Sequence, residues 1–184
     1  MKSAITICLV PEAQRGPFVF HDGIEAGCQA AAEAGFDAVE IFPSSAKEFP
    51  ASKLSSLLQK NSLNVAAVGT GAGWLKQRLS LTDGDHEKRA RAIEFISALI
   101  DTAAEYNAPV IIGSMQGQST EATTRESAIQ LLAEGLATLA DRAKGQGQML
   151  LYEPLNRYET NLLNTQEAAA QFLVIKREGN CLFR

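Results

Sequence analysis

A dense cluster of polar side chains directly follows a short apolar run. Met149-Leu150-Leu151-Tyr152 leads into Glu153, and Asn156, Arg157 and Glu159 come within the next six residues. A carboxylate at the end of a buried strand is costly to desolvate unless a metal, a cation or hydrogen bonds compensate it. The pattern predicts either a structural ion pair between Glu153 and Arg157, or a site where a carboxylate binds a metal or moves a proton.

Five short, continuous apolar runs predict the elements that position this cluster. Runs of this kind are typical of parallel strands covered by helices on both faces. They are Ala4–Val10, Ala38–Phe42, Val65–Val68, Pro109–Gly113 and Met149–Tyr152. The segments between them have helical period, most clearly Ala92–Ala103 and Ile129–Ala143. In such α/β folds functional side chains gather at the carboxyl ends of the strands, where Glu153 is expected.

Helix boundaries are marked by capping residues. Three pairs have capping-box spacing, an oxygen acceptor followed three residues later by a carboxylate. They are Asp22 with Glu25, Thr123 with Glu126, and Asn164 with Glu167. Gly35 and Gly145 suit left-handed positions at helix ends.

The repeated β-α order predicts an α/β fold with a parallel sheet and right-handed crossovers. Two architectures fit this order. A doubly wound open sheet is complete at 184 residues, whereas a (β/α)₈ barrel needs about 250. Periodicity leaves this choice open. No linker or low-complexity run divides the chain, so we expect one domain over residues 1–184.

Composition argues against several classes of partner. A net charge of -4 and a pI near 5.3 leave no basic surplus for a nucleic acid backbone. No apolar run approaches the roughly 20 residues needed to span a bilayer, so we expect no membrane partner. Cys8, Cys28 and Cys181 show no metal-binding spacing, which favours reduced thiols in a cytoplasmic protein.

With these residues in view, the segment Glu153–Thr165 resembles the fifth-strand signature of the sugar phosphate isomerase/epimerase family, whose members are xylose isomerase-like TIM barrels. Further segments resemble this family in the same order along the chain. They are Gly35–Ile41, Gly71–Trp74 with Leu79–Asp83, and Ala108–Ser114. The resemblance implies a parallel (β/α) barrel and a small sugar or hydroxycarbonyl substrate.

The resemblance also assigns roles to residues. It implies that Glu153 binds a divalent metal, Mn²⁺ or Mg²⁺, and exchanges a proton with the substrate carbon. It implies that Glu159 contacts a substrate hydroxyl, and Asn156 and Arg157 are further substrate-binding candidates. Trp74 is a candidate apolar lid over a sugar face, with plain loop packing as the alternative.

The family's remaining metal ligands lie on strands six to eight, whereas this chain stops at Arg184. We therefore expect a barrel truncated after about five βα units, incomplete for catalysis by itself and prone to homo-oligomerise through open strand edges. The alternatives are a non-catalytic barrel fragment that acts as a binding or assembly module and, less favoured, a family-two apurinic endonuclease. The latter needs several histidines at strand ends, and only His21 and His86 are present.

Two further features receive structural interpretations. Glu40 lies inside a strand run, where a buried structural hydrogen bond is the expected role. Gly69, Gly71 and Gly73 lack the spacing of a phosphate-binding loop, so we expect a tight turn over the pocket.

Overall fold

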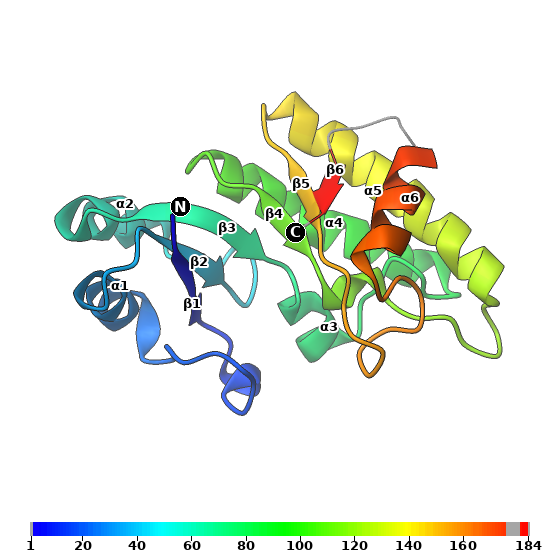
Figure 1. Ribbon diagram of the computed structural model, residues 1–184, viewed down its shortest axis with the longest axis horizontal. Coiled ribbons are helices and arrows are strands. Elements are labelled where there is room, and N and C mark those ends of the chain that lie inside the picture. Colours follow the sequence, from blue (N-terminus) through cyan, green and yellow to red (C-terminus); the bar gives the residue numbers. More distant parts are fainter. Residues whose placement is uncertain (1, 176–180, 184) are drawn as a thin grey trace.

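The computed structural model describes residues 2–175 and 181–183. It contains parallel strands that alternate with helices (Figure 1). The strands are β1 (Ala4–Cys8), β2 (Ala38–Phe42), β3 (Asn64–Gly69), β4 (Val110–Ile112), β5 (Leu150–Tyr152) and β6 (Cys181–Phe183). The α-helices are α1 (Gly23–Glu33), α2 (Ala51–Asn61), α3 (Ala72–Gln77), α4 (His86–Ala104), α5 (Arg125–Gly145) and α6 (Gln166–Ile175). Short 3₁₀ turns span Pro11–Ala13 (η1) and Ser114–Gln116 (η2).

The strand order settles the architecture that the sequence left open. The sheet runs β1-β2-β3-β4-β5-β6, and every neighbouring pair is parallel. A doubly wound sheet places its first strand in the interior, whereas here β1 lies at an edge. Consecutive order with right-handed crossovers is the winding of a (β/α) barrel, so the predicted fold class is confirmed.

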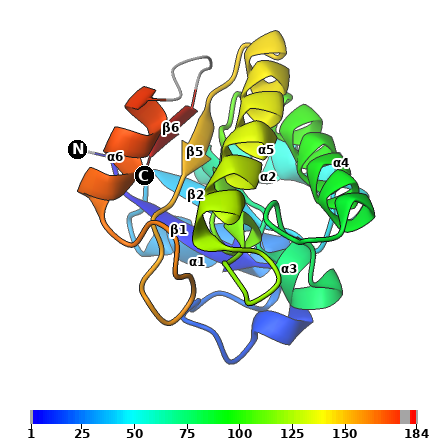
Figure 2. The same cartoon turned by 90° about the vertical axis from the view of Figure 1, so that its right-hand side faces the viewer.

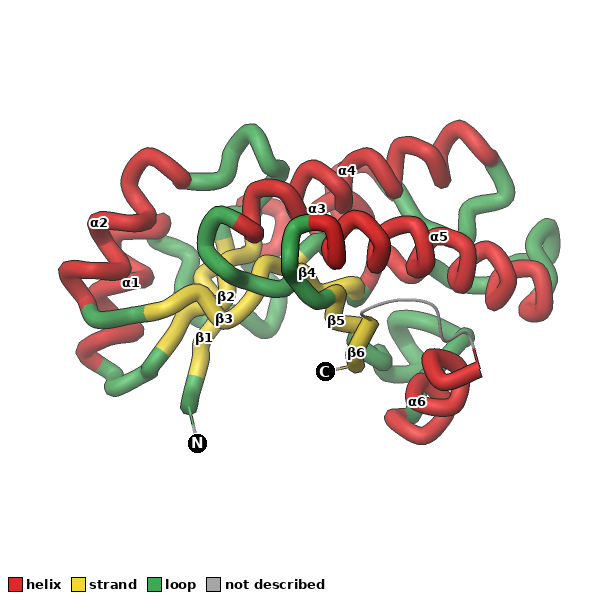
Figure 3. Tube along the Cα trace, turned by 90° about the horizontal axis from the view of Figure 1, so that it is seen from above, coloured by secondary structure: helices red, strands yellow, loops and turns green. Residues whose placement is uncertain are grey.

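The helices cover the outside of the curved sheet (Figures 1 and 3). The apolar stripes predicted for the two longest helices are buried, with Ile96 and Leu99 of α4 and Leu132 and Leu139 of α5 fully inaccessible. These two helices pack side by side (Figure 2). Their polar faces are joined by Arg142 of α5, whose guanidinium donates to both carboxylate oxygens of Asp101.

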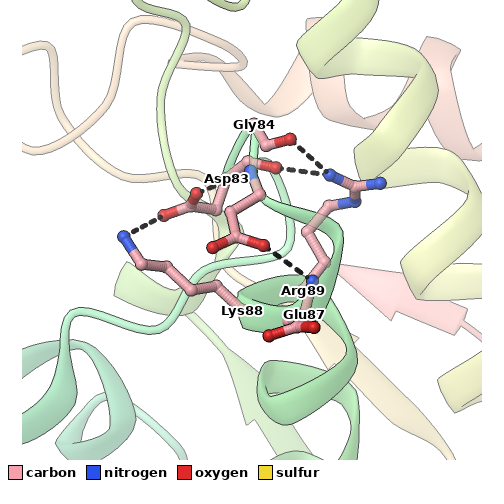
Figure 4. A network of polar contacts seen from close by, with 6 residues as sticks. Asp83, Gly84, Glu87, Lys88 and Arg89 are labelled. Carbon is pink, nitrogen blue, oxygen red and sulfur yellow. Dashed lines mark hydrogen bonds and ion pairs between the residues drawn. The ribbon is translucent and has the colours of Figure 1, made fainter.

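The start of α4 shows how a helix boundary is fixed here (Figure 4). Asp85 is the N-cap, and its Oδ1 accepts a hydrogen bond of 2.9 Å from the Glu87 amide. The Asp83 carboxylate in turn accepts a hydrogen bond of 2.9 Å from the Asp85 amide. Lys88 approaches the Asp83 carboxylate at 3.6 Å, and Arg89 donates to the Asp83 carbonyl at 2.7 Å. The Asp85 side chain therefore satisfies one of the free amides of the first turn, and neighbouring side chains hold the segment before it.

Several predicted boundary residues are displaced by one or two positions. Thr124, not Thr123, caps α5, because its Oγ1 accepts from the Ser127 amide. Before α6, Thr165 accepts from the Ala168 amide, while the predicted cap Asn164 donates to the carbonyls of Leu155 and Thr160.

The left-handed glycine after α5 is Gly147, with φ of 71°, and the predicted Gly145 is still helical. Gly35 adopts φ of 80° as predicted. Asp22 occupies the N-cap position of α1, but its side chain makes no capping hydrogen bond.

Candidate functional site

A cavity of about 310 Å³ lies at the carboxyl ends of β2 to β5. Its walls come from the strand ends, the loops after them and the segment after β1. It is lined by Thr6, Pro17, Phe18, Glu40, Phe42, Gly69, Thr70, Gly71, Ile111, Gly113, Ser114, Glu153, Leu155 and Glu159. The volume is at the lower end of the range for small-molecule sites and suits a ligand the size of a monosaccharide.

The charged groups among these lining residues are all carboxylates. Glu40, Glu153 and Glu159 face the cavity, and the described lining includes no lysine, arginine or histidine. Such a wall presents hydrogen-bond acceptors to hydroxyl groups and disfavours an anionic ligand.

The backbone of Glu153 is held on both sides. Its amide donates to the Ile112 carbonyl at 3.0 Å, which extends the pairing of β4 with β5 by one residue. Its carbonyl accepts 3.1 Å from the Gln116 side chain, and the buried Tyr152 hydroxyl donates to Gln116 Oε1. The Glu153 backbone is thereby fixed at the end of β5, where the sequence placed this residue.

A glycine makes room for this carboxylate. A Cβ added at Gly113 would lie 3.0 Å from Glu153 Oε2, closer than almost all real Cβ contacts. Any larger residue at this position would push the Glu153 carboxylate out of place.

Glu159 reaches the same cavity from the exposed loop after β5. Asn156 donates from Nδ2 to Glu159 Oε2, and its own Oδ1 accepts 2.9 Å from the Tyr158 amide. The Glu159 carbonyl accepts 2.7 Å from Gln118. Asn156 is therefore placed to orient Glu159, and it does not itself line the cavity.

The loop after β5 is joined to the loop after β4 by paired polar contacts. The buried Thr160 hydroxyl donates to the Gly117 carbonyl at 2.8 Å. Asn161 accepts from the Ser119 amide at 2.8 Å and donates to the Ser119 carbonyl at 3.1 Å. These contacts link positions more than forty residues apart in sequence, so no local pattern shows them.

Two aromatic rings form an apolar part of the cavity wall. Phe18 and Phe42 stack in a tilted arrangement, with centroids 5.2 Å apart. A Cβ at Gly69 would lie 2.8 Å from the Phe42 ring, and one at Gly71 would lie 3.1 Å from it. These glycines line the cavity as part of the turn predicted to cover it, and their lack of side chains leaves space for Phe42.

The remaining predicted site residues lie outside the cavity lining. Trp74 is half-buried in α3, packs against the hydrophobic core and has the Arg78 guanidinium 5.2 Å from its ring. Arg157 is exposed, donates to the Tyr158 hydroxyl at 3.1 Å and lies over the Tyr158 ring. The expected contacts of Trp74, Asn156 and Arg157 with a substrate stay predictions.

The cavity also contains residues that the sequence analysis did not assign to the site. Phe18 and Phe42 gave no signal beyond apolar character. Glu40 gave one, because it is the only charged residue in an otherwise apolar strand of five residues.

Within the described residues no group of three His, Cys, Asp or Glu side chains is arranged to hold a metal ion. Glu153 is one suitable oxygen donor, but a single carboxylate does not make a divalent metal site. The described cysteines supply no substitute: Cys8 and Cys28 are buried, and burial raises the pKa of each thiol. Neither lines this cavity.

The sequence matches known proteins over most of its length. Residues 28–174 match the sequence model of the family described as Xylose isomerase-like TIM barrel. A ketose 3-epimerase of Arthrobacter globiformis is 31% identical over 156 residues, which are 83% of this chain and 52% of that protein. An L-ribulose 3-epimerase of Mesorhizobium japonicum is 28% identical over 146 residues, or 77% of this chain and 47% of the relative. The chain thus spans about half the length of these curated relatives.

Solved structures share the fold. A D-psicose 3-epimerase with D-tagatose from Clostridium cellulolyticum H10 has a TM-score of 0.76 at 20% identity, covering 100% of this chain and 62% of that one. A family-2 AP endonuclease from Brucella melitensis has a TM-score of 0.72 at 19% identity, covering 100% and 68%. Different activities at such low identity make these likenesses informative about fold alone. No helix in the described ranges combines the length and apolar character needed to cross a membrane. The match over residues 28–174, together with the consecutive parallel strands, shows that this chain belongs to the family of xylose isomerase-like TIM barrels.

Proposed function

We propose that a protein carrying this chain in a complete barrel isomerises or epimerises a ketose or a related hydroxycarbonyl compound by proton transfer. The observation that carries this proposal is the position of Glu153, at the end of β5 and facing a sugar-sized cavity. The chain's membership of the family and its similarity to two epimerases support the same reaction class.

Glu153 is the proton-transfer residue of this proposal. A carboxylate whose backbone is fixed at a strand end can take a proton from a carbon next to a carbonyl and return it, provided the substrate is held within hydrogen-bond reach. Glu159 accepts a hydrogen bond from a substrate hydroxyl and is itself oriented by Asn156. Three carboxylates and no described cation around the cavity favour an uncharged sugar over a sugar phosphate.

A divalent ion, Mn²⁺ or Mg²⁺, is part of this proposal for the complete barrel. When bound, such an ion polarises a carbonyl and stabilises the charge that develops on deprotonation. Among the described residues we propose only Glu153 as a metal ligand. The described residues by themselves do not form a metal site. We also propose a cytoplasmic location, which suits the free thiols of Cys8 and Cys28.

The test is a chimera in which this chain replaces the corresponding part of the ketose 3-epimerase of Arthrobacter globiformis. The chimera should interconvert ketoses in the presence of Mn²⁺. Glu153→Gln should lower kcat by about 10²-fold or more while the fold survives, because a neutral amide cannot act as a base. Glu94→Gln, an exposed carboxylate on α4, is the matched control and should leave kcat unchanged.

The roles of the two glutamates separate in the same experiment. Glu159→Ala should raise KM or lower kcat/KM without releasing metal, because it removes a substrate contact only. Full activity of the Glu153 variant would refute the assignment of the base. Loss of metal from the Glu159 variant would show that the roles are reversed.

A second candidate function, a non-catalytic binding or assembly module, is favoured by the sheet edges. Among the described strands β1 and β6 each pair with one strand only. Open edges invite pairing with another chain. We propose that the chain by itself self-associates and turns over no common ketose, even with Mn²⁺ added. Light scattering at high concentration and an activity screen test this, and a stable monomer or metal-dependent turnover would refute it. No histidine is among the described residues that line the cavity, so we do not propose an endonuclease as a further candidate.

A further inference from the structure

We propose that Glu40 is a substrate-binding residue, whose carboxylate accepts hydrogen bonds from hydroxyl groups of the sugar. It lies on β2, on the other side of β3 and β4 from Glu153, and lines the same cavity. This inference rests on the proposed function and adds a second polar contact surface to it.

The position of Glu40 differs from that of a surface carboxylate. All five residues of β2 are buried, and Glu40 is only 8% exposed. The small exposed part faces the cavity, as does Thr6, its partner in register on β1. Together these two side chains make one wall of the cavity polar.

A break in strand register occurs beside Glu40. Val39 pairs with Val65, but Glu40 pairs with Ala67, so that β3 has one extra residue at this point. Bulges of this kind turn side chains away from the regular alternation and are frequent next to functional sites. The irregularity lies between Val39 and Glu40, next to the one charged residue of β2.

A glycine lies next to the carboxylate of Glu40 and another next to that of Glu153. A Cβ added at Gly69, the last residue of β3, would lie 3.7 Å from Glu40 Oε1. The corresponding distance from Gly113, just after β4, to Glu153 Oε2 is 3.0 Å. The distance at Gly69 is an ordinary van der Waals contact, whereas a side chain at Gly113 would crowd the Glu153 carboxylate.

A purely structural hydrogen bond does not require this exposure to the cavity. An ionised carboxylate has about four acceptor positions, so it can keep a contact within the protein and still accept hydroxyl groups of a ligand. Burying such a group is costly, and the cost is offset when the ligand supplies donors. A polyhydroxylated, uncharged sugar supplies them.

The test measures binding of ketoses and of a series of monodeoxyketoses to the full chain by ligand-observed NMR. The variants are Glu40→Gln, which keeps the shape, and the exposed control Glu94→Gln. We expect Glu40→Gln to weaken ketose binding by about 10- to 100-fold, the usual effect of losing a hydrogen bond to a charged group. For the deoxyketose that lacks the contacted hydroxyl, wild type and Glu40→Gln should bind equally.

This coupling to one hydroxyl separates binding from a structural role. If Glu40 were purely structural, its replacement would weaken the binding of all the sugars by a similar factor. That result would overturn the proposal. Unchanged ketose binding by a folded Glu40→Gln variant, as judged by circular dichroism, would also overturn it but leave the proposed function standing. If the Gln variant does not fold, Thr6→Val tests the same wall, and equal binding of all sugars by wild type and Thr6→Val would count against it. Failure of the wild-type chain to bind any ketose would overturn this proposal, whereas the proposed function of the complete barrel is decided by the chimera.

Discussion

The two ends of the sheet are built in different ways. At the amino end four helices turn into the next strand through the same motif. A residue with positive φ is followed by one whose amide donates to the carbonyl five residues earlier, which is the long bond of a Schellman motif. The left-handed residues are Gly35, Ser62, Asn107 and Gly147, and the bonds run from Phe36 to Ala31, Leu63 to Leu58, Ala108 to Ala103 and Gln148 to Ala143.

Among the described residues, the carboxyl end shows no such repeated motif. The loops after β4 and β5 are long and are held by contacts between one loop and the other, such as Thr160 with Gly117 and Gln118 with Glu159. Segments further back in the chain also contribute, since Thr82 donates to the Gln118 carbonyl at 3.1 Å. The amino end is therefore specified locally, whereas the end with the candidate site depends on tertiary contacts.

The difference suggests a division of labour between the two ends. The repeated turns at the amino end fix the spacing of strands and helices. They contain few side chains that could bind a ligand or transfer a proton. The carboxyl end carries Glu153, Glu159, Phe18 and Phe42. Such a scaffold can change its chemistry through loop residues without changing its fold.

The largest expected loss of stability follows from a substitution at Gly117, in the loop after β4. This residue has φ of 85°, and an added Cβ would lie 2.1 Å from Thr82 Oγ1. Gly117→Ala should destabilise the protein by about 2–4 kcal/mol, because backbone strain adds to overpacking. Urea unfolding measures this loss.

The matched control for Gly117 lies at the amino end. Gly147 has φ of 71°, but nothing lies within 4 Å of an added Cβ. Gly147→Ala should cost only about 1–2 kcal/mol, the conformational cost alone. Equal losses for the two variants would contradict the idea that only the carboxyl end depends on tertiary packing at its glycines.

A smaller effect is expected from Thr160, which is 1% exposed and joins the two loops. Thr160→Val keeps the volume but leaves the Gly117 carbonyl without its hydroxyl donor. We expect a loss of about 1–3 kcal/mol in unfolding free energy, the usual cost of leaving a buried acceptor unsatisfied. The control is Thr138→Val, which removes an exposed hydroxyl on α5. An equal loss in the control would show that the link between the loops contributes nothing specific.

The smallest effect is expected for the contact between Asp101 and Arg142, an ion pair on the partly exposed faces of α4 and α5. The hydrogen bond from Arg142 lowers the pKa of Asp101 below its usual value of 3.8. A lowered pKa in the folded state adds stability above that usual value, and the contribution disappears as the pH falls through the folded-state pKa.

Asp101→Asn should therefore lower Tm only slightly at neutral pH, because solvent screens exposed pairs. Thermal melts across a pH series check this. The melting temperatures of wild type and variant should converge as the pH falls below 3.8. A difference in melting temperature that stays constant through this pH range would mean that the charge of Asp101 does not contribute to stability.

The sequence predicted those features that depend on nearby residues. The five predicted strand runs, the two long amphipathic helices and the left-handed Gly35 were correct, because burial pattern and local backbone preference act within a few residues. The sixth strand, β6, was not among the predicted runs. It erred where two local solutions compete, as at Thr123 and Thr124, since neighbouring hydroxyls cap a helix equally well. Gly145 and Gly147 present the same ambiguity at the end of α5.

The candidate site divides along the same line. The sequence by itself determined that a carboxylate follows the fifth strand, because an apolar run that ends in Glu153 is visible in a few residues. Only the tertiary structure decided that the strands pair in consecutive order, which places Glu40 and Glu153 around one cavity. It also showed that Glu40, expected from the sequence to be structural, lines this cavity. Pairing between strands is a non-local choice, and a single chain read in order contains no direct signal of it.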